Sequence, residues 1–129
     1  MEARDDERAI GRLLAEYGSR LDRADHAGWV ELFAETGEFL VYGRSFAGHA
    51  QLRAMAEAAP GGLHLGAVPV IDVDGDGATV QQSFLFVDRV TREMRVGYYD
   101  DTLVRVDGAW RFETRRSTFL TPDGPSDRP

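Results

Sequence analysis

The spacing of apolar residues changes once along this chain, near residue 60, and the change limits how the chain can fold. Before it, apolar side chains recur at helical spacing, and those of a first helix expected over residues 5–24 are Ile10, Leu13, Leu14, Tyr17 and Leu21. After it, from Leu63 to Phe119, apolar and polar residues alternate as they do in strands. This order predicts an α+β fold, because a sheet with one apolar face must be covered and the only expected helices precede it.

Two shorter helices are expected in the first half of the chain. Asp25 is placed to act as the N-cap of the second helix, which is expected to end at Gly37. The stretch GEFLVYG, residues 37–43, is expected to form a strand. The third helix is expected over residues 49–59, where a Pro-Gly-Gly sequence stops it. The first half therefore contributes three helices and one strand.

The second half is expected to form a meander of about four antiparallel strands. Turn-forming sequences at residues 74–77, 90–93 and 107–108 separate its apolar segments. With the three helices packed in the concave face of a strongly curved, mixed or antiparallel sheet, the chain would form a cone-shaped α+β barrel that leaves a cavity. We expect a single domain over residues 1–120 and a disordered tail, rich in Pro, Asp and Gly, over residues 121–129.

Charge and composition exclude several classes of partner. The 15 Lys and Arg residues are scattered among 22 Asp and Glu residues, for a net charge of −7. Nucleic acids and anionic membrane surfaces bind clustered basic residues, so neither is an expected partner. The chain has no signal-peptide pattern and no run of about 18 apolar residues, and a cytoplasmic location is expected. The absence of cysteine excludes disulfides and thiolate zinc sites.

Three aspartates, Asp72, Asp74 and Asp76, match the start of a calcium-binding loop. The match fails at the twelfth position, where Ser83 replaces the bidentate glutamate, and the segment continues into a strand instead of a helix. The segment is therefore interpreted as a hairpin turn that does not bind calcium. The three histidines lack the spacing of metal ligands. Neither a metal nor a cofactor is predicted.

Several motifs occur in an order that resembles a known family. They are YGSRLDRADHAGWVELFAETGEF, a helix that starts GHAQL, the stretch GLHL, and GYYDDTLVRVDGAWRF. Together they resemble the SnoaL-like branch of the nuclear transport factor 2-like superfamily over residues 8–119. The resemblance implies the cone-shaped fold. It leaves the function open, because that fold serves polyketide cyclases, scytalone dehydratase, ketosteroid isomerase and non-enzymatic modules alike.

The nearest enzyme pattern is that of scytalone dehydratase. Through the motifs LDRAD, GLHLG and VYGRSF, this resemblance assigns catalytic positions to Asp22, His64 and Tyr42. His64 would remove or shuttle a proton and Asp22 would orient His64. Tyr42, together with Tyr17, would hydrogen-bond the developing enolate. Tyr17 also resembles the oxyanion-binding tyrosine of ketosteroid isomerase.

Two positions of the dehydratase pattern differ in this chain. Gln81 or Gln82 stands where a second histidine is expected, and Tyr99 or a neighbour replaces an asparagine. Strand alternation places Tyr99 on one face together with Asp101, and Asp100 on the other, and we expect the first face to line the cavity. The residues expected to contact the substrate are Tyr17, Trp29, Gln81, Tyr99 and Asp101.

Two functions from different classes fit these residues. The first is a cofactor-free lyase or cyclase, of the dehydratase or isomerase type, that acts on a hydrophobic, carbonyl-bearing cyclic molecule such as a polyketide-like intermediate. The alternative is a non-catalytic module that binds a small ligand or dimerises, which the glutamine in place of a second histidine favours. The two differ in whether Asp22 and His64 lie within hydrogen-bond reach in an open cavity. A homodimer through the sheet is predicted, because the helices can cover only one of its faces.

Overall fold

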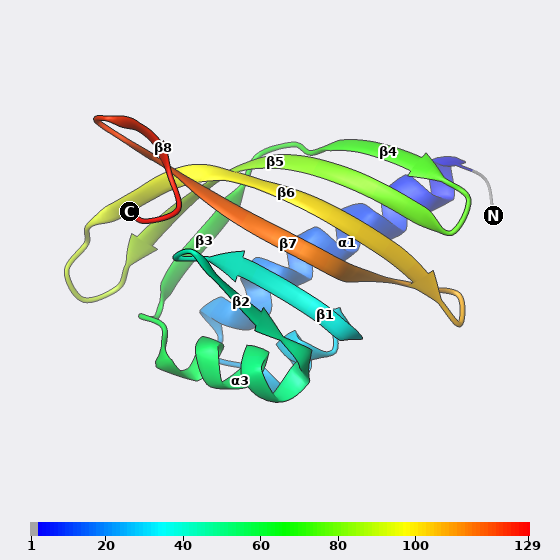
Figure 1. Ribbon diagram of the computed structural model, residues 1–129, viewed down its shortest axis with the longest axis horizontal. Helices are drawn as coiled ribbons and strands as arrows, with labels where there is room; N and C mark the ends of the chain where they lie inside the picture. The colour runs from blue at the N-terminus through cyan, green and yellow to red at the C-terminus, as the bar shows by residue number, and fades with distance from the viewer. Residues whose placement is uncertain (1–2) are drawn as a thin grey trace.

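The computed structural model describes residues 3–129 as three helices and one large, open sheet of eight strands (Figure 1). In chain order the elements are α1 (Ala3–Asp22), α2 (His26–Val30), β1 (Phe33–Val41), β2 (Arg44–Ala47), α3 (Gly48–Ala58), β3 (Gly62–Gly66), β4 (Val70–Asp74), β5 (Gly77–Asp88), β6 (Met94–Val106), β7 (Ala109–Thr121) and β8 (Gly124–Ser126). The predicted α+β architecture is confirmed, with all three helices before the long strands.

The sheet is mixed and strongly curved. Its strands lie in the order β2-β1-β7-β6-β5-β3, while β4 pairs with the first half of β5 and β8 with the end of β7. All pairs are antiparallel except β1 with β7. The long strands β5, β6 and β7 are joined by turns at two of the predicted places, residues 89–91 and 107–108. The predicted meander of about four antiparallel strands is confirmed, with its first strand divided into β3 and β4, which pair with different halves of the same edge of β5.

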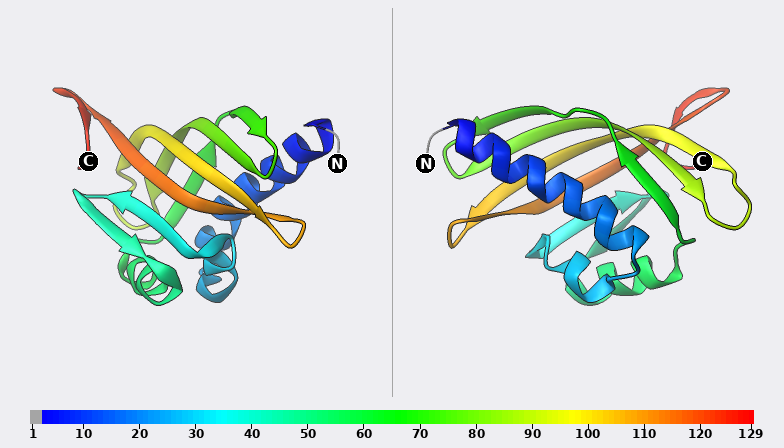
Figure 2. Two further views of the ribbon diagram at one scale, coloured as in Figure 1. Left: turned by 45° about the vertical axis from the view of Figure 1, so that its right-hand side comes forward. Right: turned by 180° about the vertical axis from the view of Figure 1, so that it is seen from behind.

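Helix α1 lies across the concave face of the sheet, and α3 packs against β1 and β2 at one end (Figure 2). The predicted apolar face of α1 is buried in the main core, where Ile10 is 0% exposed. Gly18 lets the helix approach β3 closely, because a Cβ atom there would lie 3.3 Å from both the Cβ and the carbonyl oxygen of His64. The end of α1 is thereby placed beside β3.

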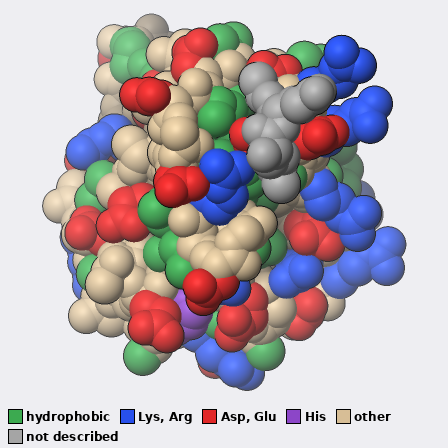
Figure 3. All heavy atoms as spheres, turned by 90° about the vertical axis from the view of Figure 1, so that its right-hand side faces the viewer, with side chains coloured by type: hydrophobic (Ala, Val, Ile, Leu, Met, Phe, Trp, Pro, Cys, Tyr) green, Lys and Arg blue, Asp and Glu red, His purple; other side chains and the backbone are tan. Residues whose placement is uncertain are grey.

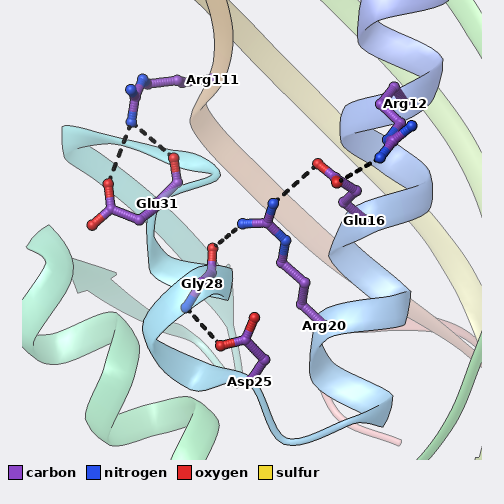
Figure 4. A network of polar contacts seen from close by, with 7 residues as sticks. All are labelled: Arg12, Glu16, Arg20, Asp25, Gly28, Glu31 and Arg111. Atoms are coloured by element: carbon purple, nitrogen blue, oxygen red, sulfur yellow. Dashed lines mark hydrogen bonds and ion pairs between the residues drawn. The ribbon is translucent and has the colours of Figure 1, made fainter.

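A polar network fixes the connection from α1 to α2 (Figure 4). The carboxylate of Asp25 accepts a hydrogen bond from the backbone nitrogen of Gly28 at 3.0 Å, which confirms the predicted N-cap. Arg20, in the last turn of α1, donates to the carbonyl oxygen of Gly28 at 2.5 Å and pairs with Glu16 at 3.3 Å. These contacts set the direction in which the chain leaves α1, just after Asp22.

The second helix ends at Val30, well before the predicted stop at Gly37. Phe33 already belongs to β1, where it is 0% exposed and pairs with Phe112 of β7. Gly37 lies in an irregularity of this pairing, and a Cβ atom there would lie 2.9 Å from the carbonyl oxygen of Phe112. The glycine is therefore required for close packing of two strands and does not end a helix.

The C-terminal segment, expected to be disordered, has a defined structure. Residues Gly124–Ser126 form β8, and Gly124 supplies the positive φ of 110° in the turn that joins it to β7. The carbonyl oxygen of Asp127 accepts a hydrogen bond from the backbone nitrogen of Tyr42 at 3.0 Å. Arg128 donates to the carbonyl oxygen of Tyr42 at 3.3 Å. Pro, Asp and Gly here form a hairpin turn, which has the same composition as a disordered tail.

Acidic and basic side chains are intermixed on the face that shows the start of α1 (Figure 3). In the part of the chain that the structure describes, no helix has the length and apolar character needed to cross a membrane.

Candidate active site

A cavity of about 530 Å³ lies between the concave face of the sheet and the helices. Its wall is mainly apolar and aromatic, with Phe39, Phe84, Phe86 and Phe119 contributed by three strands, β1, β5 and β7. It also includes six of the eight residues predicted for the site, namely Asp22, His64, Tyr42, Tyr17, Trp29 and Tyr99. A cavity of this size and character suits a small, largely apolar ligand.

Asp22 and His64 meet at one edge of this cavity. Asp22 is the last residue of α1, and His64 is the central residue of β3. The Oδ1 atom of Asp22 lies 2.7 Å from Nδ1 of the imidazole and accepts a second hydrogen bond, at 2.9 Å, from the backbone nitrogen of His64. About a fifth of each side chain remains exposed, 20% for Asp22 and 22% for His64. The structure thus brings the predicted pair together in an open cavity.

The hydrogen bonds of Asp22 determine which nitrogen of His64 is free. A carboxylate only accepts, so Nδ1 carries the proton and the neutral ring presents the lone pair of Nε2. Within residues 3–129, Nε2 has no hydrogen-bond partner. Burial lowers the pKa of His64, Asp22 opposes this effect, and Arg115 lowers the pKa further. The neutral, basic form is therefore favoured at neutral pH.

Tyr42 lies in the turn between β1 and β2, on another side of the cavity. Its φ of 57° is in the left-handed region that non-glycine residues rarely adopt. The backbone contacts from Asp127 and Arg128 hold this conformation. Its hydroxyl accepts a hydrogen bond from Nη1 of Arg95 at 3.3 Å, and its ring stacks on Phe119 with centroids 6.0 Å apart.

Tyr17, Trp29 and Tyr99 form an aromatic cluster at the base of the cavity. The ring of Tyr17 lies 5.6 Å from that of Trp29 and 5.7 Å from that of Tyr99. Burial raises the pKa of Tyr17 well above its usual value, and it also raises the pKa of Tyr99. Both hydroxyls are therefore protonated at neutral pH and can donate hydrogen bonds.

Two predicted substrate contacts lie elsewhere. Gln81 is exposed on the outer face of β5, and its neighbour Gln82 points inward. Asp101 shares the inner face with Tyr99 as predicted, but it lies outside the cavity wall and is only 4% exposed. Its carboxylate is held by Arg115, with contacts of 2.9 and 3.2 Å. Gln81 and Asp101 therefore do not line this cavity.

Arg115 of β7 is a central residue of the site region that the sequence reasoning missed. It is 0% exposed, and besides its pair with Asp101 it donates to Oε1 of Gln82 at 3.1 Å. Its Cζ atom lies 4.2 Å from the ring centroid of Tyr17 and 3.7 Å from that of Tyr99. The sequence did contain a signal for Arg115, which is a charged residue among apolar inward-facing positions of a strand. A guanidinium buried at such a position requires polar partners.

The sequence analysis also missed Arg95 of β6, although the alternation of side chains along this strand places it on the inner face. Stepping back by two residues from Tyr99 gives Gly97 and then Arg95, all on the inner face. Arg95 lines the cavity beside Tyr42. Among residues 3–129, no group of three or more His, Asp or Glu side chains is arranged to hold a metal ion.

A curved sheet with helices on its concave face and at one end, and a histidine–carboxylate pair in the cavity between them, define a class of small α+β proteins with an internal cavity. The chain belongs to the SnoaL-like domain family, whose model matches residues 2–116. No curated protein matches the chain. Its similarity to characterised folds therefore rests on the family and on solved structures.

Three solved structures are among those most similar to this chain. A Mycobacterium tuberculosis protein of unknown function, Rv3472, is 29% identical, with a TM-score of 0.84 over 92% of this chain and 76% of that one. A candidate scytalone dehydratase from Novosphingobium aromaticivorans is 27% identical, with a TM-score of 0.82 over 96% and 88% of the two chains. A nuclear transport factor 2-like protein with a cystatin-like fold, from the same organism, is 26% identical, with a TM-score of 0.83 over 92% and 84%.

Proposed function

We propose that this protein is a cofactor-free proton-transfer enzyme, a lyase or isomerase of the dehydratase or cyclase type. Its substrate would be an apolar, cyclic small molecule that carries a carbonyl group. The observation that carries the proposal is the 2.7 Å contact between Asp22 and His64, which leaves Nε2 of a cavity-lining histidine free to accept a proton. The similarity to a candidate scytalone dehydratase supports the same class of reaction.

In the first step, Nε2 of His64 removes a proton from a carbon next to the carbonyl group. The electrons of the C–H bond form a C=C bond, and those of the carbonyl move onto its oxygen to give an enolate. The ring becomes an imidazolium, whose Nδ1–H remains hydrogen-bonded to Asp22. The carboxylate stabilises this charge and holds the ring orientation, which makes Asp22 a positioning residue.

The second step returns the proton from Nε2. If it goes to another carbon of the conjugated system, the product is an isomer. If it goes to a hydroxyl on the neighbouring carbon, the enolate electrons expel that hydroxyl as water, and the reaction is a dehydration. Both outcomes leave His64 neutral, so the protein needs no further reactant. The hydroxyls of Tyr17, Tyr42 and Tyr99 are the donors available to the enolate, since these residues line the cavity.

The proposal can be tested without knowing the natural substrate. The ketone 2-tetralone is cyclic, apolar and has acidic C–H bonds beside its carbonyl. We expect the protein in D₂O to accelerate exchange of these hydrogens, measured by NMR. Replacing His64 with glutamine is expected to reduce the acceleration by about 10²- to 10⁴-fold, the usual contribution of a general base. Asp22→Asn is expected to reduce it less, because the base itself remains.

The matched control is Asp72→Asn, which removes one negative charge from an exposed position on β4. It should leave exchange unchanged. Circular dichroism and thermal unfolding establish that each variant is folded. If wild-type protein binds 2-tetralone, detected by tryptophan fluorescence, but does not accelerate exchange of it or of related cyclic ketones, the catalytic proposal fails. The same result would favour the non-catalytic ligand-binding module.

We also propose that the protein is a homodimer that associates through the outer face of its sheet. Apolar side chains on this face are contributed by three strands, β3, β6 and β7, and are between 43% and 68% exposed. They are Leu63, Leu65, Met94, Val96 and Leu120. The strand register sets them side by side, since Leu65 pairs with Leu85, which pairs with Val96. Clusters of this kind are typical of interfaces.

A further inference from the structure

Three residues of neighbouring strands form one row on the concave face of the sheet. His64 of β3 pairs in register with Phe86 of β5, and Phe86 pairs with Arg95 of β6. All three line the cavity. The ring of Phe86 lies 4.7 Å from the imidazole of His64, and the guanidinium carbon of Arg95 lies 5.7 Å from the centre of that ring. The base and the arginine therefore lie on either side of an apolar ring.

Arg95 lacks an acidic partner within the described part of the chain. No carboxylate lies within 4.0 Å of its guanidinium among residues 3–129. The nearby carboxylate of Asp88 accepts hydrogen bonds from the backbone nitrogens of Val90 and Thr91, at 2.8 and 3.1 Å. The hydrogen bond of Arg95 goes instead to the hydroxyl of Tyr42, at 3.3 Å. A guanidinium has five N–H groups, so donors remain available to a ligand.

The contact with Arg95 also orients the hydroxyl of Tyr42. Because that oxygen accepts from Nη1, its own hydrogen is free to be donated elsewhere. The strained turn at Tyr42 is held by the C-terminal segment, through the contacts with Asp127 and Arg128. Two donors, one charged and one neutral, are thus held together at the cavity wall, and Arg95 lies against the same Phe86 ring as His64.

We propose that Arg95 and Tyr42 form an oxyanion subsite that binds the carbonyl oxygen of the substrate, with its ring against Phe86 and its acidic C–H toward His64. This inference rests on the proposed function and adds the orientation of the substrate in the cavity. It favours planar molecules whose acidic carbon lies next to the carbonyl group.

The spacing of the row fits such a substrate. Neighbouring strands are about 4.8 Å apart, and β3 and β6 are separated by β5, so the backbones at His64 and Arg95 lie roughly 10 Å apart. A C–C=O unit is less than about 3 Å long, and a hydrogen bond or proton transfer at each end adds about 3 Å. Base, substrate and donor together therefore require roughly 8 to 9 Å.

Binding of 4-nitrophenol tests the subsite independently of catalysis. Its phenolate is a planar oxyanion like an enolate, and the absorbance of the phenolate reports its ionisation. We expect the wild-type protein to bind the phenolate at least about tenfold more tightly than the phenol, because hydrogen bonds to a charged oxygen are the stronger ones. The pKa of the bound probe should then be lower than in water. Arg95→Met is expected to abolish this preference, and Tyr42→Phe to reduce it.

Two control variants remove an arginine from other places. Arg116→Met changes the exposed outer face of β7, and Arg89→Met changes an exposed residue at the cavity wall. Both should keep most of the preference for the phenolate. His64→Gln should keep it too, which separates the subsite from the catalytic proposal. A wild-type protein that binds phenol and phenolate equally, or an Arg95→Met variant with an unchanged preference, would overturn the inference.

Discussion

His64 is kept neutral by its surroundings, and this matters for its proposed role. Burial is the largest influence and lowers its pKa, while the hydrogen bond and charge of Asp22 raise it. The positive charge of Arg115 lowers it further. A base must be unprotonated before it reacts, so an imidazole with a lowered pKa is ready over the whole neutral range.

The pH dependence of 2-tetralone exchange should follow from these effects. The rate is expected to rise with pH to a plateau, with its midpoint below the usual histidine pKa of 6.5. In Asp22→Asn the plateau should be lower, because the ring loses its orientation, and the rising limb should move to lower pH, because the carboxylate no longer favours the imidazolium. A limb that moves to higher pH in this variant would show that Asp22 does not act through His64.

Folding stability should depend on the same group. The pKa of His64 is lower in the folded protein than its unperturbed value of 6.5, so the unfolded state binds more protons between these two values. The contribution of His64 to stability is therefore fully present above about pH 6.5 and declines as the pH falls toward the folded-state pKa. Urea unfolding at several pH values measures this. The difference in unfolding free energy between wild type and His64→Gln should shrink from pH 7 to pH 5.

The sequence was sufficient for some of these residues and insufficient for others. Asp22 and His64 lie in motifs whose order matches a family, so their meeting across 42 residues could be expected. Gln81 was expected to face the cavity, but it lies on the outer face and Gln82 on the inner one. Successive residues of a strand point to opposite faces, and two adjacent glutamines give no indication of which one points inward. Strand alternation from Tyr99 places Arg95 on the inner face, but its position in one row with His64 depends on the register of three strands and could not be predicted.

At the scale of elements, Arg115 and Asp101 join β7 to β6 inside the core. Both side chains are 0% exposed, and burial raises the pKa of Asp101 while Arg115 opposes this. Arg115→Met is expected to destabilise the protein by about 3–5 kcal/mol, because it leaves a buried carboxylate without its partner. Adding Asp101→Leu should restore much of this loss. Urea unfolding of both variants is the measurement, and a double variant no more stable than Arg115→Met would contradict the argument.

Element boundaries were predictable where local chemistry sets them. The cap at Asp25 and the Pro-Gly-Gly sequence after α3 act through neighbouring residues, and the structure has both helix ends near the expected places. The start of β1 at Phe33 depends instead on a partner strand far along the chain, since Phe33 pairs with Phe112. The strand β8 likewise exists only through its pairing with β7. Non-local pairing of this kind leaves little trace in the local sequence.

At the scale of the whole molecule, the curvature of the sheet creates both the cavity and the exposed outer face. The concave face is filled by α1 and the aromatic side chains, except where the cavity of about 530 Å³ remains. The convex face has no helix against it in the described chain, because α1 and α3 pack on the other side or at one end. An apolar cluster on this outer face is therefore left for a second molecule to cover.

The proposed dimer leads to a specific expectation for Val96. This residue is 43% exposed, in the middle strand of the outer apolar cluster. Sedimentation should show a dimer at micromolar concentration for the wild type, and Val96→Glu should shift it to a monomer, because a charge in the centre of an apolar interface loses its water. Val106→Glu is the matched control, since Val106 is 40% exposed at the far end of β6. A wild-type monomer at these concentrations, or a Val96→Glu dimer as stable as the wild type, would place the interface elsewhere or remove it.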